Sequence, residues 1–285
     1  MQVEEKPQEK CNLCLSPVVK TQKQMKTSFF LFLFIAISIL PAHGQVDKFD
    51  KPVKFTDLNT VYEYRKSNWD GTHASSVFLY VADSNKLESF KWWQGDEEAT
   101  LVTARIDWII FSVTRFENYK LRKGQSPQFI AKLSGQKKLD IEVMGVQDSL
   151  FITELPWHSY DFDFAGLSFI WRALKNKKEP FWFHIADVAM VNQQPEFVNK
   201  GRVGVTFIGY EKIKNKNCLK YFANGIGLEN KGGHIWVNSE NYMIEQYKVE
   251  LADEPGFQNG MMQLIKTFSL SSVEWERFKK QKLGE

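Results

Sequence analysis

Apolar and polar residues alternate along several short segments of the chain, and this alternation predicts β-strands. Leu139, Ile141 and Val143 alternate with Asp140 and Glu142, which gives the segment one apolar and one polar face. Residues 101–108 and 203–207 follow the same pattern. Short alternating segments separated by turn residues favour an antiparallel sheet.

Two further segments add detail to this prediction. Residues 77–81 are apolar on both faces, which indicates a strand covered on both sides. Residues 233–251 predict a hairpin with its turn at 238–241, and residues 145–148 predict a turn that leads into a strand at 150–152. We therefore expect a mainly β fold, either a curved antiparallel sheet or an open β-barrel.

Two segments have the pattern of helices. Residues 160–175 are apolar around most of the helical circumference, with Ser159 or Asp161 as the N-cap and Pro180 beyond the end. This pattern predicts a buried central helix on the concave side of the sheet. Residues 272–283 are polar and basic and begin with a capping box of Ser271 and Glu274, which predicts a surface helix.

The N-terminal region has the layout of an export signal. Residues 29–40 are apolar and uncharged, Lys26 precedes them, and Pro41 and small residues follow. We expect a signal peptide at 25–44, an unstructured upstream extension at 1–24 and a single β-rich domain at 45–285. Two sheet halves that meet at 155–180 are the alternative. No later apolar run reaches transmembrane length, so we expect a periplasmic or secreted protein.

The cysteine content, the net charge and the glycine pattern exclude several kinds of bond, partner and cofactor. Cys11 and Cys14 form a CxxC pair that lies before the predicted signal, and Cys218 alone follows it, so the exported part has no internal disulfide. The net charge is +3 from 37 basic and 34 acidic residues, which argues against nucleic acid as the main partner. No glycine-rich phosphate loop opens a helix, and we expect no cofactor.

The densest polar cluster offers weak candidates for catalysis. His158, Asp161 and Asp163 lie close in sequence, and His184 with Asp187 repeats the His-x-x-Asp spacing. Such side chains could bind a metal or transfer protons in an envelope or polysaccharide hydrolase. The two aspartates also suit a helix N-terminus, and a histidine in an apolar strand is typical of a hydrogen-bonded core residue. We therefore predict no metal site.

Aromatic and apolar residues suggest two kinds of binding. Phe164, Leu167 and Trp171 on the predicted central helix could line a cavity for an apolar or amphipathic envelope molecule. Trp92 and Trp93 are adjacent, so on a strand their rings face opposite ways and one could stack on a sugar. Filling of the core explains most of the other tryptophans equally well.

A resemblance to a known family rests on three sequence passages within residues 150–255. They are Val203–Glu211 with its Gly-Tyr-Glu end, Lys216–Lys220, and Gly232–Val237 with a G-x-x-W-V pattern. Their order resembles a family of exported bacterial β-proteins of unknown function, which is distantly similar to periplasmic lipoprotein carriers. The resemblance implies an exported protein with a curved open sheet wrapped around helices over an apolar cavity, and it provides no catalytic residues to transfer. We expect a non-enzymatic protein, because the sequence contains no catalytic constellation. A glycan-binding module and a hydrolase are the alternatives.

Overall fold

The protein consists mainly of β-strands that belong to one sheet. The structure is a computed structural model, and it describes residues 48–49, 57–121, 127–135, 137–159, 166–252 and 256–285. The strands are β1 (Thr60–Ser67), β2 (Ser75–Val81), β3 (Lys86–Trp92), β4 (Ala99–Asp107), β5 (Ser112–Leu121), β6 (Phe129–Ser134), β7 (Lys138–Val143), β8 (Val146–Phe151), β9 (Trp157–His158), β10 (Phe181–Val191), β11 (Gln194–Ile213), β12 (Lys216–Asn224), β13 (Gly233–Asn238), β14 (Ile244–Val249) and β15 (Gly260–Ser269).

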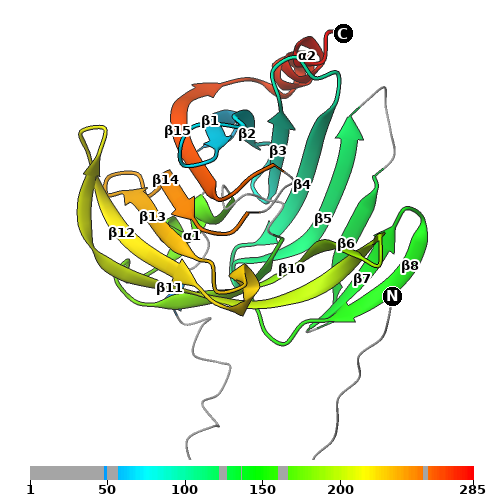
Figure 1. Cartoon of the computed structure of the whole chain (residues 1–285), viewed down its shortest axis with the longest axis horizontal. Helices are drawn as coiled ribbons and strands as arrows, with labels where there is room; N and C mark the ends of the chain where they lie inside the picture. Colours follow the sequence, from blue (N-terminus) through cyan, green and yellow to red (C-terminus); the bar gives the residue numbers. More distant parts are fainter. Residues whose placement is uncertain (1–47, 50–56, 122–126, 136, 160–165, 253–255) are drawn as a thin grey trace, which may run out of the picture. The chain divides into compact units, whose positions relative to one another are not determined.

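The first and last strands of the chain, β1 and β15, are neighbours in the sheet. The sheet runs β8-β7-β6-β5-β4-β3-β2-β1-β15-β14-β13-β12-β11-β10-β9, so β1 pairs with β15 at its centre. Every pairing is antiparallel except that of β9 with β10. Figure 1 shows that the sheet curves strongly without closing into a barrel. The predicted curved antiparallel fold is confirmed.

The inner face of the sheet, which we define as the face that carries the larger core, follows the predicted alternation. Val102, Ala104 and Ile106 of β4 are buried in this core, whereas Arg105 between them is exposed. A period of two places these three side chains on one face, and their burial removes apolar surface from water. The strand predicted at 101–108 is β4.

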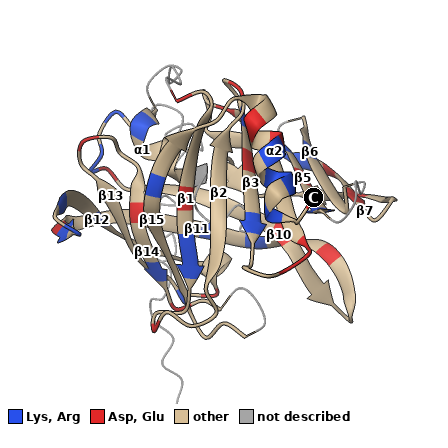
Figure 2. Cartoon of the chain, turned by 90° about the horizontal axis from the view of Figure 1, so that it is seen from above, with Lys and Arg blue, Asp and Glu red and all other residues tan. Residues whose placement is uncertain are grey.

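The outer face carries a smaller second core. In β2, Val77, Leu79 and Val81 belong to the inner core, while Phe78 and Tyr80 belong to the outer one. The prediction that residues 77–81 are covered on both faces is therefore confirmed. The cover on the outer side is the helix α2 (Ser272–Lys282), which lies over neighbouring strands in Figure 2.

The helix α2 begins as the sequence predicts. The Ser271 hydroxyl accepts a hydrogen bond from the Glu274 amide, and the Glu274 carboxylate accepts one from the Ser271 amide. Most of the helix is exposed, but Trp275 is only 1% exposed. Its ring stacks on Tyr80 at 4.9 Å between centroids, and its Nε1 donates to Glu88 at 2.7 Å. Trp275, together with Phe278 against Phe78 and Lys279 paired with Glu88, thus fixes a mostly polar helix to the sheet.

The prediction of a continuous helix at 160–175 is wrong for the described part of this segment, where the helix is much shorter. A 3₁₀ turn, η4 (Gly166–Phe169), leads into a single α-helical turn, α1 (Ile170–Ala173). The helix ends because Leu174 adopts an extended conformation and forms a bridge with Phe49, and the Lys175 amide donates to Lys48. Burial of this segment is confirmed, since Phe169, Ile170 and Trp171 are fully buried. Residues 160–165 lie outside the described residues.

Two predicted turns can also be compared with the structure. The turn predicted at 145–148 is shorter, because Met144 and Gly145 with positive φ join β7 directly to β8. The turn predicted at 238–241 is present between β13 and β14. The predicted signal peptide and the Cys11–Cys14 pair lie outside the described residues. Within the described ranges, no helix has the length and apolarity needed to cross a bilayer.

Replacement of Trp275 should destabilise the protein strongly. We expect Trp275→Ala to lower the free energy of unfolding by about 3–5 kcal/mol, because it removes a buried aromatic ring and leaves Glu88 without one donor. Urea unfolding followed by tryptophan fluorescence measures this change. Val273→Ala on the same helix is the control, since Val273 is 67% exposed and should change stability by less than about 0.5 kcal/mol. Equal midpoints for the two variants would contradict the anchoring role.

Candidate functional site

A pocket of about 420 Å³ lies where the chain leaves the core after α1. It is between the segment that follows α1, the strands β11 and β12, and the β13–β14 turn. Its lining consists of three lysines, two tyrosines and three other residues: Lys175, Lys177, Lys178, Tyr210, Tyr242, Asn176, Leu219 and Ser239. We call it the lysine–tyrosine pocket.

One wall of the pocket is fixed by Lys177. Its ammonium group donates to the carbonyl of Leu174, which the end of α1 leaves free, and lies 4.9 Å from the Tyr242 ring centroid. Its own carbonyl accepts a hydrogen bond of 2.6 Å from the Tyr221 hydroxyl. Burial raises the pKa of Tyr221, so that hydroxyl keeps its proton and remains a donor. The backbone at Lys177 is therefore held from both sides.

A second lysine, Lys178, lies over two aromatic rings, one of them exposed. The Lys178 ammonium is 5.3 Å from the Tyr210 ring centroid and 5.6 Å from that of Phe207. The two rings pack edge to face at 5.2 Å, and Tyr210 is 64% exposed. Contact with the rings stabilises the cation without neutralising it. Lys178 thus presents a full positive charge to the pocket.

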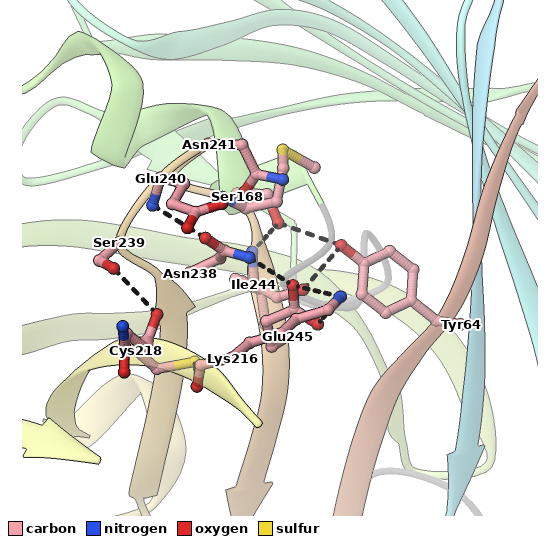
Figure 3. A network of polar contacts seen from close by, with 12 residues as sticks. Tyr64, Ser168, Lys216, Cys218, Asn238, Ser239, Glu240, Asn241, Ile244 and Glu245 are labelled. Atoms are coloured by element: carbon pink, nitrogen blue, oxygen red, sulfur yellow. Dashed lines mark hydrogen bonds and ion pairs between the residues drawn. The ribbon is translucent and has the colours of Figure 1, made fainter. Parts of the chain in front are cut away.

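The opposite wall is the β13–β14 turn, which Asn238 holds in shape (Figure 3). The Asn238 side chain accepts from the Glu240 amide at 2.8 Å and donates to the Glu245 carboxylate at 2.9 Å. Its carbonyl accepts from the Tyr242 amide at 3.0 Å. These bonds position Ser239 and Tyr242, the two pocket residues that the turn contributes.

Hydrogen bonds also join the β13–β14 hairpin to the buried η4–α1 segment and to β1. The Ser168 hydroxyl accepts from the Ile244 amide at 3.1 Å, and the Tyr64 hydroxyl donates to the Ile244 carbonyl at 3.1 Å. Arg172 of α1 donates to the Asn241 carbonyl at 3.0 Å. Both walls of the pocket are therefore built on one hydrogen-bonded unit, so their spacing is fixed by the fold.

The lining of the pocket has a cationic part and an apolar part. Three of its lining residues are lysines and none is acidic, and among the described residues no carboxylate forms an ion pair with Lys175 or Lys178. Leu219, which belongs to the inner core, and Tyr242, which packs against that core, form the apolar part. Such a site attracts an anionic group and leaves room for an apolar one beside it.

The residues predicted to bind an apolar ligand lie elsewhere. Leu167 and Trp171 are 4% and 0% exposed and pack within the inner core, where Trp171 contacts Phe181 and Tyr221. Neither residue lines the lysine–tyrosine pocket, which begins at Lys175. Phe164 lies outside the described residues. Their role as ligand contacts stays a prediction.

Trp92 and Trp93 are half-buried, and Trp92 is partly covered. The Lys282 ammonium lies 4.6 Å from the Trp92 ring centroid, and the Trp92 Nε1 donates to the Asp96 carbonyl at 3.3 Å. The ring also packs against the outer core. A sugar that stacks on Trp92 would have to displace the lysine.

His158 lies deep in the inner core. Its Nε2 donates to the Phe111 carbonyl at 3.1 Å, and its ring contacts those of Phe111 and Phe183. Because a carbonyl only accepts, Nδ1 is the unprotonated nitrogen, and it has no partner in the described part of the chain. Burial lowers the pKa of His158 to about 3, against the opposing effect of the Phe111 hydrogen bond.

His184 points away from His158. Its neighbours Phe183 and Ile185 belong to the inner core, so the strand alternation turns His184 to the other face. There it donates to the Asn199 side chain and accepts from Thr153 at 3.3 Å. Asp161 and Asp163 lie outside the described residues. Across the described ranges, no three His, Cys, Asp or Glu side chains are close enough to hold a metal ion.

The sequence shows no sign of the pocket itself; its three lysines stand out only as basic residues near the end of a predicted helix. Lys175, Lys177 and Lys178 near the end of a predicted helix are the pattern that the helix dipole favours. The actual helix ends at Ala173, so these lysines belong to an irregular segment. Their convergence with Tyr210 and Tyr242 depends on contacts across the sheet, for which the sequence has no local signal.

Acid should destabilise the fold through His158. A pKa of about 3 in the folded state, below the ordinary 6.5, means that protons bind the unfolded chain preferentially as the pH falls below 6.5. We expect the stability advantage of the native chain over a His158→Gln variant to fall by about 1.4 kcal/mol per pH unit between pH 6 and pH 4. Urea titrations at several pH values measure it. Parallel pH profiles for the two proteins would refute the assignment.

Comparisons with known proteins establish no family. No family model matches the chain, and no curated protein matches it. Among solved structures, the crystal structure of MucB is similar over 77% of this chain and 57% of the MucB chain, with 8% sequence identity and a TM-score of 0.23. The chain thus spans little more than half of the length of MucB, and a likeness of this degree supports no argument about function.

Proposed function

We propose that this protein is an exported, non-catalytic binding protein, and that its ligand is an amphipathic envelope molecule with an anionic head group. The lysine–tyrosine pocket is the observation that supports this proposal. It combines three ammonium groups and no carboxylate with an apolar floor at Leu219. Export rests on the apolar segment at 29–40 and its flanks.

The head group would lie between Lys175 and Lys178, which are exposed and make no ion pair with a described carboxylate. An anion between two such ammonium groups can accept charge-assisted hydrogen bonds from both, and these are stronger than hydrogen bonds between neutral groups. Asn176 and Ser239 also line the pocket and can hydrogen-bond to uncharged oxygen atoms of the head group.

The apolar part of the ligand would follow Leu219 and the faces of Tyr210 and Tyr242. Tyr210 is the most exposed of these residues, at 64%, so a bound hydrocarbon chain would remove its ring from water. Burial of apolar area contributes about 25 cal/mol per Å², so even a short chain adds measurably to the affinity. The pocket volume of about 420 Å³ admits a head group and the first part of one chain.

Binding of dodecyl phosphate to the full chain tests this proposal. We expect isothermal titration calorimetry, below the micelle concentration of the ligand, to detect binding at one site. Lys175→Glu and Lys178→Glu should each weaken the affinity about tenfold or more, because each replaces an attraction with a repulsion. Lys231→Glu is the matched control, since Lys231 is an exposed lysine outside the pocket.

Two further ligands separate the parts of the proposal. Dodecyl maltoside has the same chain without a charge and should bind far more weakly. Inorganic phosphate has the charge without a chain and should also bind weakly. Equal binding of either molecule, or equal loss of affinity in Lys231→Glu, would overturn the proposed site.

A further inference from the structure

The outer face of strands β3 to β6 carries a row of four basic residues. Lys86 lies directly opposite Arg105, Arg105 opposite Arg115, and Arg115 opposite Lys132. Residues paired in this way share a face of the sheet. The neighbouring residues Leu87, Ala104, Phe116 and Ala131 are buried in the inner core, so the four cations point outward. We call these four residues the cation row.

Like charges in directly opposite positions destabilise a sheet. The carboxylates that compensate them lie beside the row: those for Lys86 and Arg115 follow on the same strands, and Asp140 of β7 lies directly opposite Lys132 at the end of the row. Lys86 pairs with Glu88 two residues on at 2.6 Å, and Arg115 pairs with Glu117 two residues on at 2.6 Å. The row itself therefore remains an uninterrupted line of positive groups across three strand pairings.

Arg105 in the middle of the row is only weakly neutralised. It pairs with the Asp83 carboxylate only at 3.9 Å, and its Nη1 donates to the neutral side chain of Asn85 at 2.8 Å. The Arg105 side chain is 47% exposed. The β4–β5 register shifts directly after Arg105, and such a bulge alters the direction of nearby side chains. The guanidinium is thus available to an external anion.

The row borders a hollow in the surface. A cavity of about 260 Å³ is lined by Lys86, Thr103, Arg105, Arg115 and Glu117. The Thr103 hydroxyl donates to Glu117 at 3.0 Å, and hydrogen bonds from Arg115, Tyr119 and Thr103 lower the pKa of Glu117 despite the opposing effect of burial. Glu117 is therefore ionised and occupied, and it orients the Arg115 guanidinium at the edge of the hollow. Figure 2 shows α2 beside these strands, and the groove between them carries both lysines and glutamates, so the positive charge is concentrated at the row.

We propose that the cation row binds a linear acidic polysaccharide that lies across the strands. Adjacent strands are about 4.8 Å apart, so the row presents one positive group at each such interval. A polyuronate carries one carboxylate on every sugar, so a chain that lies along the row can bring several carboxylates to its cations. Arginine binds carboxylates through two parallel hydrogen bonds, and the Thr103 hydroxyl oxygen can accept a hydrogen bond from a sugar hydroxyl.

The chemistry of the hollow favours a polysaccharide over a nucleic acid. Sites for single-stranded nucleic acids combine cations with aromatic rings on which the bases stack. The residues that line the hollow include no aromatic side chain. They offer instead charged and hydroxyl groups, which match a chain of sugar acids. This site is on the outer face, and it does not depend on the lysine–tyrosine pocket.

Binding of polygalacturonate fragments to the full chain tests this proposal. We expect fluorescence anisotropy with labelled fragments at low ionic strength to show binding that weakens as salt is added. Arg105→Glu should weaken the affinity about tenfold, and Arg105→Gln, which removes the charge without adding an opposite one, should weaken it by a smaller factor. Lys231→Glu and Lys178→Glu should bind as the native chain does, because both residues lie outside the row.

Three outcomes would overturn the proposal. One is unchanged affinity in Arg105→Glu when its urea midpoint shows that it is folded. Another is equal binding of neutral dextran, which would show that charge is not recognised. The third is equal or tighter binding of single-stranded DNA of matched length, which would assign the row to nucleic acid. Loss of dodecyl phosphate binding in Lys178→Glu alone leaves this proposal intact, so the two sites can fail separately.

Discussion

Burial of the segment from Leu167 to Leu174 inside the curved sheet is the constraint on which the other features depend. A strongly curved sheet turns its inner face toward itself, and the space enclosed must be filled by side chains if the interior is to reach normal packing density. Ile170, Trp171 and Leu174 are fully buried there. Because Ser168 and Arg172 bond to the β13–β14 hairpin, this segment also determines where the chain leaves the core. The lysines of the pocket lie at that exit.

The two proposed sites use positive charge in different ways. In the lysine–tyrosine pocket, irregular backbone brings three ammonium groups around a small volume, which suits a compact head group. In the cation row, regular strand spacing distributes the charges along a line, which suits an extended ligand. The net charge of +3 conceals both arrangements, because the chain has 34 acidic residues against 37 basic ones. Local placement of charge, and not its total, is what a ligand encounters.

The strands could be predicted because alternation is a local property. Val102, Ala104 and Ile106 indicate a strand without knowledge of its neighbours, and Ser271 with Glu274 indicates the start of α2 in the same way. The central helix could be predicted only in part. Its apolar residues showed burial correctly, but the extended conformation of Leu174 depends on a bridge to Phe49, which is remote in sequence.

The sites required information that no single segment contains. Lys86, Arg105, Arg115 and Lys132 are unremarkable separately, and only the register of three strand pairings aligns them. Tyr210 and Tyr242 meet Lys177 and Lys178 through contacts between distant strands. His158 and His184 illustrate the reverse case, since their similar sequence contexts suggested a shared site and the pleat of the sheet separates them.

The pairing of β1 with β15 at the centre of the sheet also governs how the chain can fold. Within each half of the sheet, most strands pair with their neighbours along the chain. The pairing of β1 with β15, which joins the halves, connects the first and last strands of the sequence. The outer core adds a contact between Glu88 and Trp275, which are 187 residues apart. Such non-local contacts form slowly because the loop must close before they contribute. The two halves therefore remain unjoined during synthesis until β15 becomes available, so the edge of β1 that β15 covers stays unpaired until that stage.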